Sequence, residues 1–186
     1  MLKPAAVSRR EFLKVATRVA AVSVPTMLVA CDDTPDADRK LEFVTLRDAL
    51  VEAEKLALAA ASQHGPVWTL SQTCIHCAQS IEYSLTGFPV SKSELFQRTA
   101  GAAAFSVFQW RGRMSHNLAE EIPGAPSLDP GTDLDAAMQR LRNSINSFAR
   151  AEHSLKPHFA YGLLAKSDYE QAHAMHLANH FSAFTR

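Results

Sequence analysis

Three histidines with regular spacing stand near the C-terminal end of this 186-residue sequence. His173, His176 and His180 follow one another at intervals of three and four residues. At about 100° of rotation per residue in an α-helix, these side chains and Tyr169 fall within roughly 60° of one another. Two imidazoles four residues apart can be aimed at one metal ion from the same helix face. The pattern therefore favours a metal site built on this segment.

A further histidine, His76, lies in a segment, residues 69–86, whose apolar side chains recur with helical spacing. Cys74 and Cys77 belong to the apolar stripe, whereas His76 lies off it and faces either a neighbouring helix or water. Redox Cys-x-x-Cys pairs usually sit at a helix N-terminus, where the thiol pKa is lowered. Because this pair lies deeper in the helix, we interpret both thiols as packing residues and leave a disulfide between them open.

The segments that must position these histidines are predicted to be helical. Alanine is abundant, glycine is scarce with 7 residues, and 47% of the side chains are hydrophobic, enough for one core. No segment has a convincing strand pattern. Helices are expected over about residues 45–64, 69–86, 91–110, 132–153 and 167–184. Their N-terminal caps or capping boxes are expected at Thr45, Thr69, Ser91, Thr132 and Ser167.

Two connections between these helices have the composition of functional loops. Residues 111–131 are rich in proline and glycine and longer than packing requires, and they include His116. The second connection, marked by Pro157 and Gly162, includes His158. Each of these two histidines can bind substrate or transfer protons at the mouth of a site, and each can equally serve to stabilise a turn.

The N-terminal residues have the pattern of an export signal. Arg9 and Arg10, followed by an apolar pair and Lys14, resemble the bacterial twin-arginine signal. The apolar stretch over residues 15–30 is too short and too polar for a stable transmembrane helix. We therefore expect residues 1–30 to be a twin-arginine signal peptide that directs the chain, through the twin-arginine export machinery, to the periplasm.

Residues 28–31 read Leu-Val-Ala-Cys and resemble a lipobox, in which Cys31 is lipidated. The other interpretation is a chance cysteine beside an ordinary cleavage site. Asp32 directly after the cysteine implies, by resemblance to lipoprotein sorting rules, retention at the inner membrane. The remaining chain is expected to form a polar tether over residues 31–43 and one helical-bundle domain over residues 44–186. Contact with the membrane is expected only through this lipid anchor.

Three segments, residues 68–89, 113–126 and 158–180, together resemble an uncharacterised bacterial family of the DinB/YfiT-like superfamily of candidate metalloenzymes. The resemblance implies an all-α fold, a four-helix bundle with an extra helix and long connecting loops. It also implies a divalent metal ion bound by His76, His176 and His180, with a fourth position left for water or substrate. Three histidine ligands suit Zn, Ni or Fe, and three protein ligands with an open position are typical of catalytic sites.

One position departs from the family pattern. Members often carry a histidine just before the last ligand, where this chain has Asn179, and His173 stands one turn earlier instead. His173 can replace a ligand, hydrogen-bond the site or line it. We expect His173, His116, His158 and Tyr169 around the site as supporting or substrate-contacting residues, and the sequence identifies no catalytic residue.

The function implied is a metal-dependent hydrolase or thiol transferase acting on a small molecule of unknown identity. The alternative is a non-catalytic periplasmic module that binds metal or a ligand. The formal net charge of zero argues against nucleic-acid binding, and a homodimer is compatible with the sequence. Haem is disfavoured because the chain lacks a Cys-x-x-Cys-His attachment motif.

Overall fold

The computed structural model describes residues 38–59, 65–152 and 155–184. Within these ranges the chain forms helices and no β-strand, apart from isolated bridge residues such as the pair His158 and Gly162. The elements are α2 (Leu46–Leu58), α3 (Leu70–Thr86), α4 (Glu94–Phe96), the π-helical turn η2 (Gln97–Gly101), α5 (Ala102–Arg111), α6 (Leu134–Arg150) and α7 (Lys166–Phe181). The all-α class expected from the sequence is confirmed.

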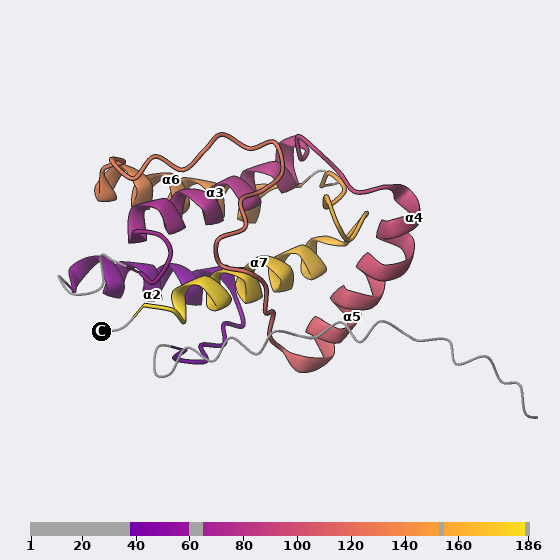
Figure 1. Ribbon diagram of the computed structural model, residues 1–186, viewed down its shortest axis with the longest axis horizontal. Helices are drawn as coiled ribbons and strands as arrows, with labels where there is room; N and C mark the ends of the chain where they lie inside the picture. Colours follow the sequence, from indigo (N-terminus) through magenta and orange to yellow (C-terminus); the bar gives the residue numbers. More distant parts are fainter. Residues whose placement is uncertain (1–37, 60–64, 153–154, 185–186) are drawn as a thin grey trace, which may run out of the picture. The chain divides into compact units, whose positions relative to one another are not determined.

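Four helices enclose the main core. α3 packs against α6 and α7, and α2 packs against the same two helices. In Figure 1, α3 and α6 lie above α2 and α7, while α4 and α5 stand to one side. A second, smaller apolar cluster joins α5 and the loop after it to α7. It consists of Phe105, Met114, Ala172 and Met175.

The amphipathic sequence of α6 explains how the core is closed. Buried side chains recur along α6 every three or four residues, and its other faces are polar. Leu141 and Phe148 are almost fully buried there against Leu56, Ile81 and other apolar side chains of the core cluster. Burial of one such side chain stabilises the fold by about 1.5–3 kcal/mol. This packing holds α3, the helix that carries His76, in a fixed position.

The helix starts only partly follow the sequence expectations. Capping boxes at Thr45 and Thr69 are present. The third helical stretch is capped by Ser93 rather than Ser91, and α6 by Asp133 rather than Thr132, since these side chains accept the backbone N–H three residues on. The box expected at Ser167 is wrong.

The start of α7 is set by a tertiary contact. Helix α7 begins at Lys166 after Ala165, with no side-chain cap. Lys166 Nζ donates to the carbonyls of Ala149 and Ala151 at 2.8 and 2.9 Å. These acceptors lie at the end of α6, so the first residue of α7 is fixed against the C-terminus of its neighbour and Ser167 is already inside the helix.

The segment before α2 is joined to the end of α7. Arg39 N donates to the carbonyl of Ser182 at 3.0 Å, and Leu41 N donates to Ser182 Oγ at 2.9 Å. The Arg39 guanidinium also pairs with the buried carboxylate of Glu52 on α2, at 2.6 Å. These bonds fix the C-terminal end of the histidine-bearing helix.

Among the described residues, none of the helices combines the length and the apolar character needed to cross a membrane. The expected signal peptide, Cys31 and most of the expected tether lie outside the described residues. So do residues 60–64, which the sequence assigned to the first helix, and residues 153–154.

Candidate metal centre

His76 from α3 meets His176 and His180 from α7. One ring nitrogen of each can be chosen so that all three lie within 4.8 Å of one another. His76 Nε2 and His176 Nε2 are 3.1 Å apart. The three ring centroids are 4.8–5.0 Å apart. The three histidines that the family resemblance implies as ligands are therefore brought together.

The packing of α3 on α7 decides the direction that helical spacing left open for His76. Its side chain is buried and points toward the neighbouring helix rather than toward water. His176 and His180 lie one turn apart on α7 and face α3. Two rigid helices thus supply all three imidazoles, a more precise support than a loop.

Unsatisfied ring nitrogens in this group are compatible with a bound cation. His76 Nδ1 and His180 Nε2 are buried and have no hydrogen-bond partner among the described residues. An unpaired buried polar atom costs about 1–3 kcal/mol, so such atoms are rare without a purpose. A nitrogen-only donor set of this kind suits Zn, Ni or Fe rather than Mg or Ca, which prefer oxygen ligands.

Burial keeps the three imidazoles neutral. Desolvation lowers the pKa of His76 to about 3, with a smaller effect from His116. Desolvation, with smaller effects from the neighbouring histidines, also lowers the pKa values of His176 and His180 well below the usual 6.5. Neutral imidazole is the form that binds metal, so no proton has to be displaced at neutral pH.

Trp68 forms one wall of the site, and sequence reasoning missed it. Its indole ring stacks on His180 with ring centroids 5.7 Å apart, and lies 4.9 Å from the ring of His76. Trp68 directly precedes the cap residue Thr69, outside the helix, so no helical periodicity could assign it to a face. Its ring therefore covers His76 and His180 on one side.

The loop after α5 brings His116 to the same place. Its ring centroid lies 5.1 Å from that of His176 and 5.0 Å from that of His180. The loop is held to α3, because Gln72 Nε2 and Gln79 Nε2 donate to the carbonyls of Leu128 and Pro126 at 3.0 and 3.1 Å. The long connection therefore passes beside the three histidines.

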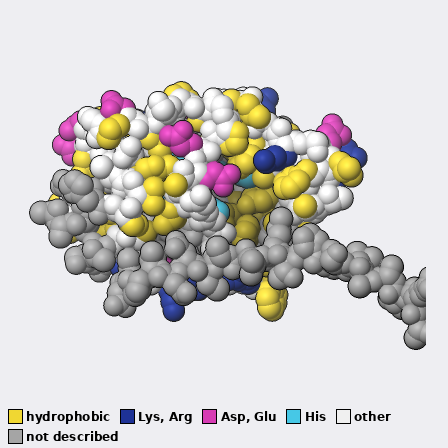
Figure 2. Space-filling model, viewed as in Figure 1, with side chains coloured by type: hydrophobic (Ala, Val, Ile, Leu, Met, Phe, Trp, Pro, Cys, Tyr) yellow, Lys and Arg dark blue, Asp and Glu magenta, His cyan; other side chains and the backbone are white. Residues whose placement is uncertain are grey.

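A pocket of about 230 Å³ opens beside the histidines. Its walls combine His76, His116 and His176 with largely apolar side chains from the loops, such as Met114 and Ile122. Figure 2 shows a hollow in this face with hydrophobic and histidine side chains inside it and charged side chains at its rim. The volume suits a small molecule whose body is mostly apolar.

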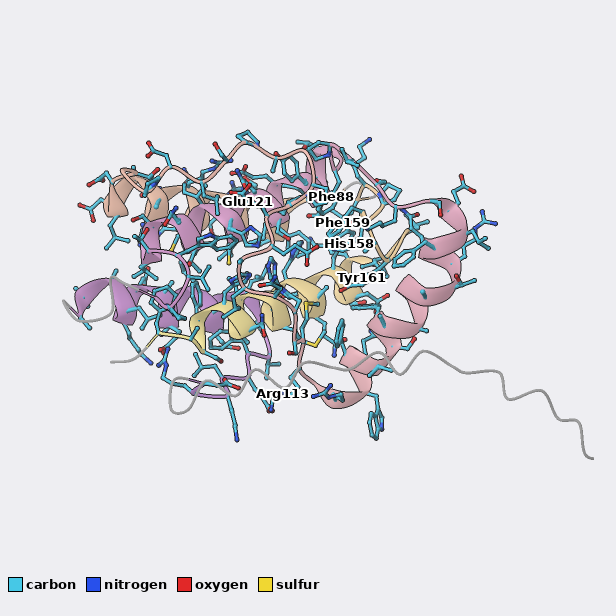
Figure 3. The ribbon with its side chains drawn as sticks, in the orientation of Figure 1. Phe88, Arg113, Glu121, His158, Phe159 and Tyr161 are labelled. Carbon is cyan, nitrogen blue, oxygen red and sulfur yellow. The ribbon has the colours of Figure 1, made fainter. Side chains whose placement is uncertain are left out.

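Another part of the pocket wall, around His158, is aromatic. His158 stacks on Tyr161 with centroids 4.2 Å apart and planes at 5°. Phe88 and Phe159 lie against the same imidazole, at 5.0 and 4.6 Å (Figure 3). His158 Nδ1 accepts the backbone N–H groups of Ala160 and Tyr161 at 3.1 and 3.2 Å. Since Nδ1 is the acceptor, the ring hydrogen is on Nε2.

A comparison with protein families matched residues 36–186 to the family described as "Protein of unknown function (DUF1569)". The chain belongs to this family. Comparisons with curated proteins and with solved structures gave no match.

Two expected site residues of the DUF1569 chain lie beside the three-histidine group rather than in it. His173 lines the pocket and stacks on Tyr169 at 5.3 Å, and its Nε2 is buried without a partner among the described residues. Tyr169 is fully buried, and its hydroxyl donates to the carbonyl of Lys156 at 2.6 Å. Tyr169 therefore supports the loop that carries His158.

The Cys-x-x-Cys pair of the DUF1569 chain lies in the core. Cys74 and Cys77 are fully buried free thiols, and Cys74 Sγ donates to Met138 Sδ at 3.5 Å. Desolvation raises the pKa of Cys74 to about 12. The packing role expected from the sequence agrees with this position.

Proposed function

We propose that this chain is an exported helical-bundle protein that binds one divalent metal ion through His76, His176 and His180, and that it is a metal-dependent enzyme of hydrolase or thiol transferase type. The observation that carries the proposal is the convergence of these imidazoles, with their ligand atoms within 4.8 Å of one another, at a pocket for a small molecule.

In this proposal the side chains of the site hold the ion, orient the substrate and exclude water. Three neutral imidazoles leave a fourth coordination position, which is the arrangement of catalytic rather than structural sites. When bound, a divalent ion acts as a Lewis acid and can lower the pKa of a water or thiol ligand. The apolar walls at Met114 and Ile122 place the substrate body next to that position.

The export and location of the chain belong to the same proposal. The twin-arginine pattern at Arg9 and Arg10 supports export to the periplasm, and the lipobox-like residues 28–31 support a lipid anchor on Cys31 at the inner membrane. The twin-arginine route moves folded proteins, so the ion can be bound before export. A four-helix bundle of DinB/YfiT type is supported by the packing of α2 and α3 against both α6 and α7.

The second candidate is a non-catalytic metal- or ligand-binding module. The observation that favours it is His116, whose ring lies about as far from His176 and His180 as these two lie from each other. A permanently filled fourth position would make the metal structural. The two candidates therefore differ in whether an added ligand or substrate can reach the ion.

The test is metal analysis of the full chain, purified without a histidine tag from medium that contains Zn, Ni and Fe. His76→Phe and His180→Phe keep the ring volume and remove the ligand nitrogens, and His158→Asn is the matched control in the same pocket. We expect about one ion per chain in the wild type and the control, and none in the two ligand variants. Circular dichroism checks that each variant is folded.

Two results would overturn the proposal: a wild-type chain that carries no ion, or an ion that survives both ligand substitutions. If the ion is present, ester hydrolysis and thiol transfer are screened with His76→Phe as the blank. Turnover that depends on the ion favours the enzyme, and its absence over the whole screen favours the module.

A further inference from the structure

We propose that His116 is a fourth, displaceable metal ligand that the loop between α5 and α6 holds over the three-histidine site. This inference rests on the proposed metal site and adds to it. It identifies what occupies the fourth coordination position before a substrate arrives, and it makes entry of a substrate a ligand exchange rather than an addition.

The four imidazoles form one cluster. The rings of His76, His176 and His180 are 4.8–5.0 Å apart, and His116 lies at 5.1 and 5.0 Å from the last two. Five of the six ring separations within this group are therefore nearly equal, and the sixth pair, His76 and His116, is not in ring contact. His116 therefore lies beside the site, next to the two ligands of α7, from where it can reach a fourth coordination position.

The hydrogen bond of His116 occupies Nδ1 and leaves Nε2 free to bind a metal ion. Its Nδ1 lies 3.1 Å from the carbonyl oxygen of Asn117. A carbonyl can only accept, so Nδ1 carries the hydrogen and Nε2 carries the lone pair. Histidines that bind metals typically donate their other ring N–H to a carbonyl in this way, which fixes the ring and raises its basicity.

The turn around His116 is held by a hydrogen bond and by buried side chains on both sides. Asn117 Oδ1 accepts the backbone N–H of Ala119 at 3.0 Å, which closes a local turn directly after the histidine. Met114 on one side and Ile122 on the other are buried. The loop is thus anchored on both sides of the residue that it presents to the site.

Two observations make this ligand the displaceable one. The set of ligand atoms that lie within 4.8 Å of one another includes those of His76, His176 and His180 but none of His116, so His116 is less tightly grouped than the other three. It is also the only one of the four that a loop carries, whereas the others stand on α3 and α7. The pocket is lined by His116 and His176 together, so a molecule that enters it meets both a proposed metal ligand of α7 and this ring.

The test is a Co²⁺ titration of the metal-free full chain, followed by visible absorption, with His116→Ala and His116→Phe beside the wild type. His158→Asn, another pocket histidine, is the matched control. We expect removal of His116 to weaken Co²⁺ binding about 10–100-fold with the stoichiometry kept, and to change the cobalt spectrum. The control should titrate like the wild type.

A second readout uses azide as the probe ligand. If His116 fills the fourth position, azide must displace it in the wild type but finds an open position in His116→Ala. Azide should therefore bind the cobalt form of His116→Ala more tightly, and added imidazole should restore the wild-type spectrum of this variant. Equal Co²⁺ and azide affinities in the wild type and both variants would overturn the proposal.

These outcomes separate the two proposals. A wild-type chain that takes up no Co²⁺ defeats the metal site itself, and the role of His116 with it. Uptake that is lost in His76→Phe but unchanged in both His116 variants keeps the three-histidine site and rejects His116 alone. Thermal unfolding followed by circular dichroism establishes that the loop variants are folded.

Discussion

The indole ring of Trp68 lies nearly parallel to the imidazole of His180, with the planes at 10° and the centroids 5.7 Å apart. This contact couples an intrinsic fluorophore to a proposed metal ligand. The other tryptophan of the chain, Trp110, is 86% exposed on α5. The two tryptophans should therefore differ in their response to metal.

We expect Co²⁺, which quenches nearby fluorophores, to quench the emission of Trp68 and to leave that of Trp110 nearly unchanged. Trp68→Phe should abolish the quenching, whereas Trp110→Phe should retain it. The measurement is an emission titration of the metal-free chain. Quenching that persists in Trp68→Phe would place the bound ion elsewhere.

His158 should contribute to stability through its Nδ1 atom. Two backbone N–H groups, of Ala160 and Tyr161, use it as their acceptor. Replacement by leucine leaves both donors without this partner, so His158→Leu should lower the free energy of unfolding by about 1–3 kcal/mol. His158→Asn keeps an acceptor at a similar position and should cost less. Urea denaturation measures both, and equal stabilities of the two variants would contradict this role.

Gly101 should tolerate no side chain. A Cβ added there would lie 1.9 Å from the carbonyl oxygen of Ala160, which belongs to the turn at the far wall of the pocket. Gly101→Ala should therefore displace this turn and cost about 1–3 kcal/mol in thermal or urea unfolding. Gly131→Ala is the control, since its Cβ would first meet the carboxylate of Asp129 at 3.3 Å. Comparable losses in both variants would argue against the close contact.

The metal-free protein should lose stability as the pH falls. Desolvation lowers the pKa values of His158 and His173 to about 3, against 6.5 in the unfolded chain. Below pH 6.5 the unfolded state therefore binds more protons than the folded state. The contribution of these two histidines to the free energy of unfolding is complete above pH 6.5. It is lost progressively toward pH 3, by about 1.4 kcal/mol per pH unit for each histidine.

His158→Asn provides the check on this pH dependence. Between pH 6 and 4.5, its free energy of unfolding should fall less steeply than that of the wild type, by the contribution of one histidine. Urea denaturation with a chelator present gives both slopes. Identical slopes would mean that His158 is not kept neutral by the fold.

The local features of the fold were predictable because they depend on neighbours in the sequence. The caps at Thr45 and Thr69 use side chains three residues apart, and both are present. The spacing of His176 and His180 likewise placed them on one helix face. The start of α7 was not predictable in this way, because Lys166 reaches carbonyls at the end of α6.

The remaining parts of the candidate site depend on contacts between distant segments. Helical spacing could not decide whether His76 faces α7 or water, and only the packing of α3 on α7 does so. The approach of His116 to His176 depends on the path of a long loop that Gln72 and Gln79 hold in place. Neither contact leaves a pattern in the local sequence.

The separation of the ligands along the chain has a consequence for biosynthesis. His76 and His176 meet across 100 residues, and α7 carries two of the three proposed ligands. A growing polypeptide presents His76 long before its partners have been translated. On the proposed function, all three ligands are together only once synthesis has passed Phe181 and α7 has docked, so metal loading would follow translation of this domain rather than accompany it.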